Sequence, residues 1–135
     1  MSEARAIYQS GRKKRRRTGH HEDDEQAALF DWAAHYPVLE WLHAIPNGGN
    51  RDPREAARLK RQGVKKGVSD IFLPLPRDGY HGLYIEMKRR RRDGYAALRP
   101  GQQQFLDDMQ KQGYKTAVCY GADEAIETLK AYCDI

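Results

Sequence analysis

One seven-residue stretch, Gly82–Lys88, constrains the fold more than any other part of the chain. Because the side chains of a β-strand point alternately to its two faces, this stretch predicts a strand with one apolar and one polar face. The apolar face carries Leu83, Ile85 and Met87, and the polar face carries Tyr84, Glu86 and Lys88. The apolar face must be buried on a core, while the other can present a carboxylate beside an ammonium.

A second strand-like run, Ser69–Leu73, lies just upstream of this stretch, across a turn-rich segment at 74–79. If the two runs pair as a hairpin, Asp70 comes near Glu86. Two carboxylates beside a lysine are the smallest set that can bind a divalent metal and activate water. The competing interpretation is a solvated strand face, because half-exposed antiparallel strands alternate in this way as a rule.

Composition limits the class of protein. The 135 residues suit one domain, and 39% hydrophobic with 32% charged residues is typical of a polar but foldable chain. No apolar run approaches the length of a membrane span, and no secretory signal is visible. Cys119 and Cys133 lack zinc-site spacing, and the five histidines form no metal-ligand pattern. We therefore expect free thiols in a reducing, cytoplasmic compartment and no contact with a membrane.

Positive charge is concentrated near the N-terminus. Residues 1–21 hold seven lysines and arginines and one acid, a formal charge of +6, whereas residues 22–135 carry −1. Six consecutive cations at 12–17 repel one another, so we expect residues 1–21 to be a disordered basic tail and 22–135 to be the folded domain. The tail can act as an electrostatic arm for nucleic acid. A plain solvated tail, or a targeting signal that leaves nuclear localisation open, is the alternative.

Hydrophobic periodicity and turn residues predict eight elements in the order α-β-α-β-β-α-β-α. Helices are predicted at 22–36, 53–62, 102–112 and 122–133, and strands at 38–45, 69–73, 82–88 and 114–120. Asp52 followed by Pro53 is a good helix start, and Gly63 and Gly113 are good helix ends. The chain is therefore predicted to be an α/β domain with a mixed central sheet flanked by helices.

Two polar residues, Glu25 and Gln102, lie on the apolar faces of predicted helices, each one turn ahead of the first apolar residues. A carboxylate at the start of a helix can simply favour the positive end of the helix dipole. The functional interpretation directs Glu25 into a site at the rim of the core.

Basic residues cluster ahead of Asp70 and after Glu86. They are candidates for contact with nucleic-acid phosphates, while a soluble helix face is the alternative. The candidates are Arg51, Arg54, Arg58, Arg61, Lys65, Lys66, Arg89, Arg90, Arg91 and Arg92.

Several short motifs, in this order and at this spacing, resemble the VRR-NUC family of the PD-(D/E)xK nuclease superfamily over about residues 22–133. The resemblance is closest to the small stand-alone members of phages and bacteria. It rests on Glu25-Gln26, Pro46-Asn47-Gly48-Gly49 with Arg51, Gly63 to Asp70, Ile85-Glu86-Met87-Lys88, and Leu98-x-Pro-x-Gln102 followed by Gly113-Tyr114. Ser69 replaces a proline that is frequent in the family, and Gly101 replaces a residue that favours helix more.

The resemblance implies a catalytic set of Glu25, Asp70, Glu86, Lys88 and Gln102. Its metal ligands would be Asp70, Glu86, the Met87 backbone carbonyl and, in one alternative, Glu25. Hard oxygen ligands suit Mg²⁺ or Mn²⁺. The resemblance also implies a DNA endonuclease acting on branched DNA such as Holliday junctions, in the cytoplasm of a bacterial or phage-infected cell.

The resemblance to resolvase-like stand-alone members also implies a homodimer, because resolving a four-way junction needs two symmetric cuts and a twofold dimer provides two sites. Interface aromatics could come from Trp41, Tyr80 or Tyr95, although burial in the core is an equal alternative for each. The rival functions are a monomeric enzyme that nicks flaps or single strands, a non-catalytic nucleic-acid-binding accessory protein, and a structural DNA-packaging protein.

Overall fold

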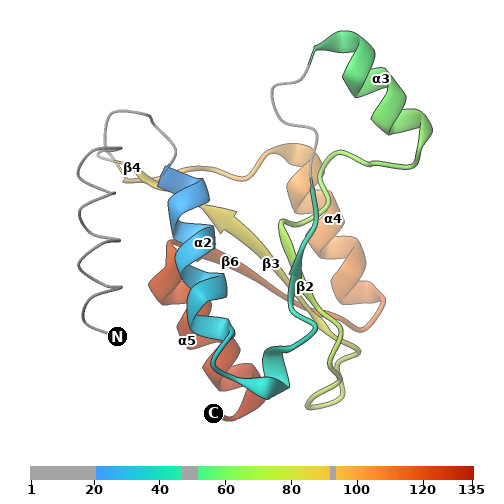
Figure 1. Cartoon of the computed structure of the whole chain (residues 1–135). Helices are drawn as coiled ribbons and strands as arrows, with labels where there is room; N and C mark the ends of the chain where they lie inside the picture. The colour runs from blue at the N-terminus through green and yellow to red at the C-terminus, as the bar shows by residue number, and fades with distance from the viewer. Residues whose placement is uncertain (1–20, 47–51, 92–93) are drawn as a thin grey trace.

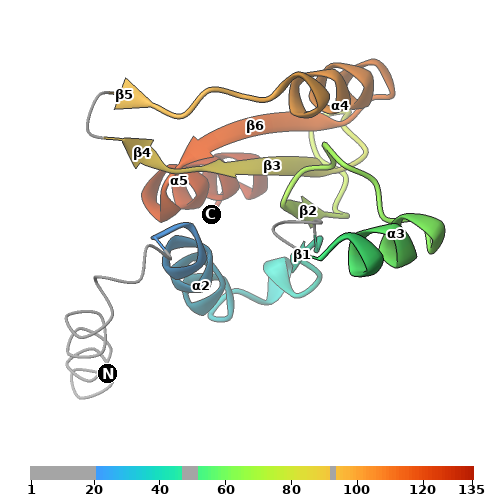
Figure 2. The ribbon, with the colours of Figure 1, turned by 90° about the horizontal axis from the view of Figure 1, so that it is seen from above.

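The computed structural model describes residues 21–46, 52–91 and 94–135. A four-stranded sheet separates two layers of helices (Figures 1 and 2). Helices α2 (His21–Ala33) and α5 (Ala122–Cys133) cover one face, and α4 (Pro100–Lys111) covers the other. The predicted α/β fold with a mixed central sheet is thus confirmed. The predicted basic tail lies outside the described residues, apart from His21 at the start of α2.

The sheet has the strand order β1-β2-β3-β6, formed by His43–Ala44, Ile71–Leu73, Leu83–Lys88 and Lys115–Tyr120. β1 pairs with β2 and β2 pairs with β3 in antiparallel orientation, whereas β3 and β6 are parallel. The crossover connection between β3 and β6 contains α4. The main elements follow the predicted order. A separate pair of short strands, β4 (Arg90–Arg91) and β5 (Gly94–Tyr95), is added between β3 and α4.

The strand predicted at 38–45 is largely wrong. The chain instead forms a 3-10 helix, η1 (Pro37–Leu39), and only His43–Ala44 is extended. Leu39 and Leu42 are both buried, and a spacing of three residues turns them to the same side of a helical turn rather than of a strand. The amide of Leu42 donates to the carbonyl of Leu39 at 3.1 Å, which continues the turn.

The core lies between the sheet and the α2/α5 layer. Its fully buried members come from both helices and from the two central strands. They include Leu29, Ile71, Leu73, Leu83, Ile85 and Leu129. Leu83 and Ile85 show that the apolar face of the alternating stretch is directed into this core, as predicted. No helix in the described residues is long and apolar enough to cross a membrane.

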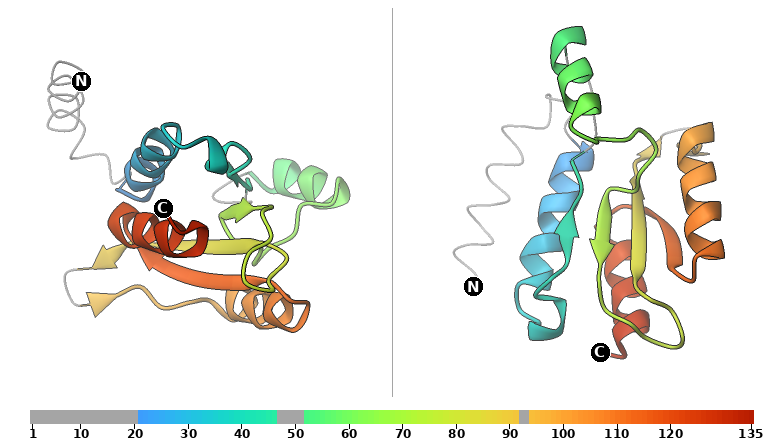
Figure 3. Two further views of the ribbon diagram at one scale, coloured as in Figure 1. Left: turned by 90° about the horizontal axis from the view of Figure 1, so that it is seen from below. Right: turned by 90° about the vertical axis from the view of Figure 1, so that its right-hand side faces the viewer.

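Helix α3 (Pro53–Arg61) projects from the body of the domain (Figure 3). It begins as predicted, because the Asp52 carboxylate accepts a hydrogen bond from the Arg54 amide at 2.7 Å. It ends at Gly63, whose positive φ of 101° lets the amides of Gly63 and Val64 bond back to the last turn. None of its residues is buried, so its cationic side chains are available to a partner.

Candidate active site

The β2-β3 hairpin brings Asp70 to the strand that carries Glu86. Ile71 of β2 pairs with Ile85 of β3, and the two strands are antiparallel. Asp70, the residue before β2, therefore lies opposite Glu86. The Asp70 carboxylate accepts a hydrogen bond from the backbone amide of Met87 at 2.7 Å. This bond holds the carboxylate against the β3 backbone, between Glu86 and Lys88. The predicted hairpin is confirmed.

Glu86 and Lys88 lie on the sheet face covered by α4. Their side chains are only 2% and 9% exposed, respectively. A solvated strand face would leave both largely in water, so that interpretation is wrong. Charged side chains are rarely buried unless they are paired, because removing a charge from water costs several kcal/mol in general. A buried carboxylate and ammonium on one strand indicate a specialised site.

Gln102, in the first turn of α4, joins these two side chains. Its Oε1 accepts from the Lys88 ammonium at 2.7 Å and from the Arg99 amide at 2.9 Å, while its Nε2 donates to Glu86 Oε2 at 3.3 Å. Glutamine can fill this position because its amide both accepts and donates hydrogen bonds. The structure therefore brings Gln102 together with Glu86 and Lys88.

Aromatic packing fixes α4 against the sheet next to these bonds. Phe105 on α4 meets the Tyr84 ring edge-to-face at 5.0 Å between centroids, and Tyr84 stacks on Phe72 of β2 at 4.3 Å. Burial, followed by the charge of Tyr114, raises the pKa of the Tyr84 phenol. Tyr84 therefore stays neutral at physiological pH and serves as a packing residue for the turn that carries Gln102.

Glu25 is a residue of α2, and its carboxylate lies at the start of α5. Its Oε2 accepts a hydrogen bond from the Ala122 amide at 3.4 Å. A Cβ at Gly121 would approach Glu25 Oε1 to 3.2 Å, so glycine leaves room for the carboxylate. An anion at a helix N-terminus is stabilised by the helix dipole. The geometry thus gives Glu25 a capping contact on the α2/α5 side of the sheet, whereas Gln102 contacts Glu86 from the α4 side.

The described basic candidates are on the surface. Those with exposed side chains are Arg54, Arg58, Arg61, Lys65, Lys66 and Arg89. Arg58 also forms a surface ion pair with Glu55, one turn before it in α3. Arg51 and Arg92 lie outside the described residues, and nothing can be said of the side chains of Arg90 and Arg91. The surface beside the site is therefore positively charged on α3 and on the segment that follows it.

The donor set fits a hard divalent cation that keeps water ligands. Within the described ranges, no group of three or more His, Cys, Asp and Glu side chains could hold a metal by itself. Asp70 and Glu86 offer two carboxylates, and backbone carbonyls such as that of Met87 are further oxygen donors. Mg²⁺ is commonly bound by one or two carboxylates together with waters and substrate phosphates, rather than by a complete protein cage.

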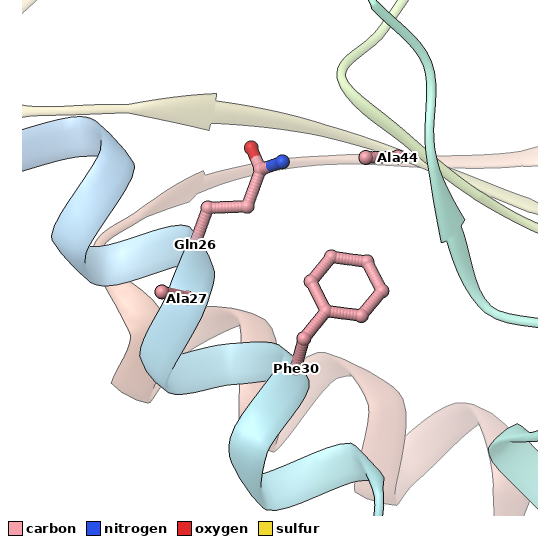
Figure 4. A pocket seen from close by; sticks show the side chains of 4 residues that line it. All are labelled: Gln26, Ala27, Phe30 and Ala44. Atoms are coloured by element: carbon pink, nitrogen blue, oxygen red, sulfur yellow. The ribbon is translucent and has the colours of Figure 1, made fainter.

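A separate open pocket of about 450 Å³ lies between α2 and β1 (Figure 4). It is lined by Gln26, Ala27, Phe30 and Ala44, and Figure 4 shows the Phe30 ring and the Gln26 amide on the side of α2 that faces Ala44. This lining contains no titratable group. The pocket therefore lacks the groups required for acid–base or metal chemistry, which are gathered around Glu86.

One backbone feature of the site has no signal in the sequence. It is a close approach of Gly67 to Gly101, where a Cβ on Gly67 would lie 2.6 Å from the Gly101 carbonyl oxygen. This contact depends on packing between distant segments, so local sequence patterns do not reveal it. The bond from the Arg99 amide to Gln102 is local by contrast, because a glutamine three residues after the residue that precedes a helix commonly bonds back to that residue's amide.

Ser69 offers a test of the packing beside Asp70. It is fully buried, and its hydroxyl has no hydrogen-bond partner among the residues that the structure describes. Since an unsatisfied buried hydroxyl costs about 1–3 kcal/mol, Ser69→Ala should raise the free energy of unfolding by about 1 kcal/mol. Urea unfolding measures this change, with Thr116→Ala as control because the Thr116 hydroxyl accepts from Gln110. A destabilised Ser69→Ala variant would show that the hydroxyl has a partner.

Comparisons with known proteins agree with these observations. A family model described as the VRR-NUC domain matches residues 12–123. A solved structure named "VRR_NUC domain protein" is 30% identical, with a TM-score of 0.72 over 86% of this chain and 90% of that chain. No curated protein matches the sequence. The matched segment contains Glu25, Asp70, Glu86, Lys88 and Gln102.

Proposed function

This chain belongs to the VRR-NUC family, a family of nuclease domains, and from that premise we propose that it is a metal-dependent DNA endonuclease. The observation that carries the proposal is the buried Glu86–Gln102–Lys88 arrangement beside Asp70. A protein that only binds nucleic acid needs exposed cations and has no use for a buried carboxylate joined to a buried ammonium. Hydrolysis of a phosphodiester uses both groups.

Asp70 and Glu86 would hold Mg²⁺ or Mn²⁺, with the Met87 carbonyl as a further oxygen ligand. The bound ion would supply a water of lowered pKa and draw charge from the scissile phosphate. Lys88 can orient the attacking water or stabilise the developing negative charge, since its ammonium is already held by Gln102. Gln102 acts as the orienting group for both Glu86 and Lys88. Glu25, whose carboxylate accepts from the Ala122 amide, is the candidate ligand for a second metal ion or for a metal-bound water.

The substrate proposal rests on charge. Cations on α3 and on residues 64–67 lead directly to Asp70, so a DNA backbone lying along them would reach the carboxylates. Arg54, Arg58, Arg61, Lys65 and Lys66 are all exposed on this path. Phosphate contacts position a nucleic acid without reading its sequence. We therefore infer that specificity comes from the shape of the DNA.

We further propose that the substrate is branched DNA and that the working unit is a homodimer. One chain carries one Asp70/Glu86 pair, whereas resolution of a four-way junction needs two symmetric cuts. Trp41 is 71% exposed and Tyr80 is 37% exposed, so both are available for an interface. Nothing can be said of the side chain of Tyr95.

The experiment that tests the function compares a four-way junction, a flap, a linear duplex and single-stranded DNA, each with Mg²⁺ and with chelator. The expected result is metal-dependent, paired cuts on the junction and a light-scattering mass of twice 15.6 kDa. Metal-dependent but unpaired nicks made by a monomer would show that the protein is a flap or single-strand nickase and not a resolvase. Binding without cleavage of any substrate would show that it is a DNA-binding accessory protein.

The basic tail is expected to add affinity without adding structure preference. Replacing the six cations at 12–17 by glutamine should reduce the slope of log K against log salt by up to about 5, as expected for six lost phosphate contacts. Filter binding of junction and linear duplex between low and physiological salt measures the slope. The ratio of the two affinities should stay constant. An unchanged slope would show that the tail does not contact DNA.

A further inference from the structure

The segment that joins α3 to β2, residues 62–69 and here called the strap, crosses the first turn of α4 (Figure 1). The contact is made at Gly67, whose φ is +88°. A Cβ at this position would lie 2.6 Å from the Gly101 carbonyl oxygen and 2.8 Å from its carbon. Both atoms belong to the backbone and cannot rotate away, so a side chain at Gly67 would force the strap and α4 apart.

The part of α4 in contact with Gly67 is the turn that carries Gln102. The Gln102 amide nitrogen would be 3.4 Å from the same Cβ position, and that amide also donates to the Arg99 carbonyl at 2.9 Å. The Gln102 side chain then reaches Lys88 and Glu86 on the neighbouring strand. A shift of about 1 Å in this turn would break hydrogen bonds of 2.7 and 3.3 Å, because such bonds weaken steeply with distance.

We propose that Gly67 is a positioning residue for the site: its backbone contact with Gly101 fixes the first turn of α4 so that Gln102 holds Lys88 and Glu86. Gly67 contributes no side chain and acts through Gln102. The catalytic consequence rests on the proposed nuclease function, whereas the placement of Gln102 can be measured without it.

Two other glycines provide matched controls. Gly63 lies in the same strap with a φ of +101°, but a Cβ there would meet nothing within 4 Å. Gly63→Ala therefore imposes the same kind of backbone strain as Gly67→Ala without the contact. At Gly101, within the helix, a Cβ would lie at an ordinary 3.9 Å from the Gly67 Cα. Gly101→Ala fits, whereas the larger Gly101→Val presses on the strap from the α4 side.

The first measurement is the NMR signal of the Gln102 side-chain amide, identified by its loss in Gln102→Ala. The signal should move toward those of exposed glutamines in Gly67→Ala and Gly101→Val, and stay in place in Gly63→Ala and Gly101→Ala. If Gly67→Ala does not fold, Gly101→Val carries the same test. An unmoved signal in folded Gly67→Ala, or an equal shift in Gly63→Ala, would overturn the proposal.

The second measurement is a double-mutant cycle on metal-dependent cleavage. Gly67→Ala should lower kcat about tenfold in the wild-type background and less than about twofold when Gln102→Ala is already present, because residues that act through one contact are not additive. Equal losses in both backgrounds would mean that Gly67 has only a general structural role. If the wild type does not cleave DNA, the proposed function fails, and the NMR result still decides the positioning role.

Discussion

Asp70→Asn and Glu86→Gln are each expected to lower the rate of DNA cleavage by about a thousandfold or more. A metal ion contributes several kcal/mol of transition-state stabilisation, and every 1.36 kcal/mol is a factor of ten in rate. Both substitutions remove a negative ligand with little change in shape. In Asp70→Asn, the side-chain amide oxygen can still accept the hydrogen bond from the Met87 backbone N–H, so the hairpin contact should persist. The measurement is single-turnover cleavage of a labelled junction at saturating enzyme.

Binding separates loss of chemistry from loss of fold. The exposed cations of α3 and the strap are untouched, so both variants should bind DNA about as tightly as the wild type in chelator. Asp108→Asn is the matched control, because it removes an exposed carboxylate from α4 with the same change in charge. If either variant cleaved DNA at the wild-type rate, the carboxylate that it lacks would not be a ligand of the metal ion.

Lys88→Met is expected to lower kcat by about 10²–10³, the usual cost of removing one donor that stabilises charge in a transition state. The methionine keeps most of the side-chain volume, but Gln102 Oε1 loses its charged donor. Lys88→Arg should recover only part of the rate, since the planar guanidinium needs more room than a 9% exposed position offers. Steady-state kinetics should show a fall in kcat with little change in KM.

Lys111→Met provides the control for Lys88, because it removes an exposed cation from the end of α4. It should leave kcat unchanged. Wild-type kcat in Lys88→Met would show that the ammonium is a structural partner of Gln102 and has no part in the chemistry.

The hairpin could be predicted from the sequence because its determinants are local. Alternation from Leu83 to Lys88 sets the two faces of β3, and the turn-rich segment before it sets the pairing that brings Asp70 alongside. The burial of Glu86 could not be predicted in this way. It depends on α4 lying over the polar face, which is a contact between segments that are distant in the chain.

Two further elements show where local patterns fail. The apolar residues at 38–45 predict a strand. The chain instead forms a 3-10 helix that begins at Pro37, and Leu39 and Leu42, which are three residues apart, lie on the same side of the helical turn. For Glu25, the periodicity places the carboxylate on the apolar face of its own helix, but it does not reveal the contact with the start of another helix, α5. A sequence pattern gives the face of a helix, but not the neighbour that the face will meet.

The central claim is that hydrolysis needs a divalent ion held by Asp70 and Glu86. The most direct test is the cleavage rate of a four-way junction by chelator-treated protein, titrated with Mg²⁺ or Mn²⁺, for the wild type and Glu86→Gln. The account predicts no cleavage in chelator, a saturable rise in wild-type rate with added metal, and no comparable rise for the variant. Undiminished wild-type cleavage in excess chelator, or an identical metal response in Glu86→Gln, would contradict it.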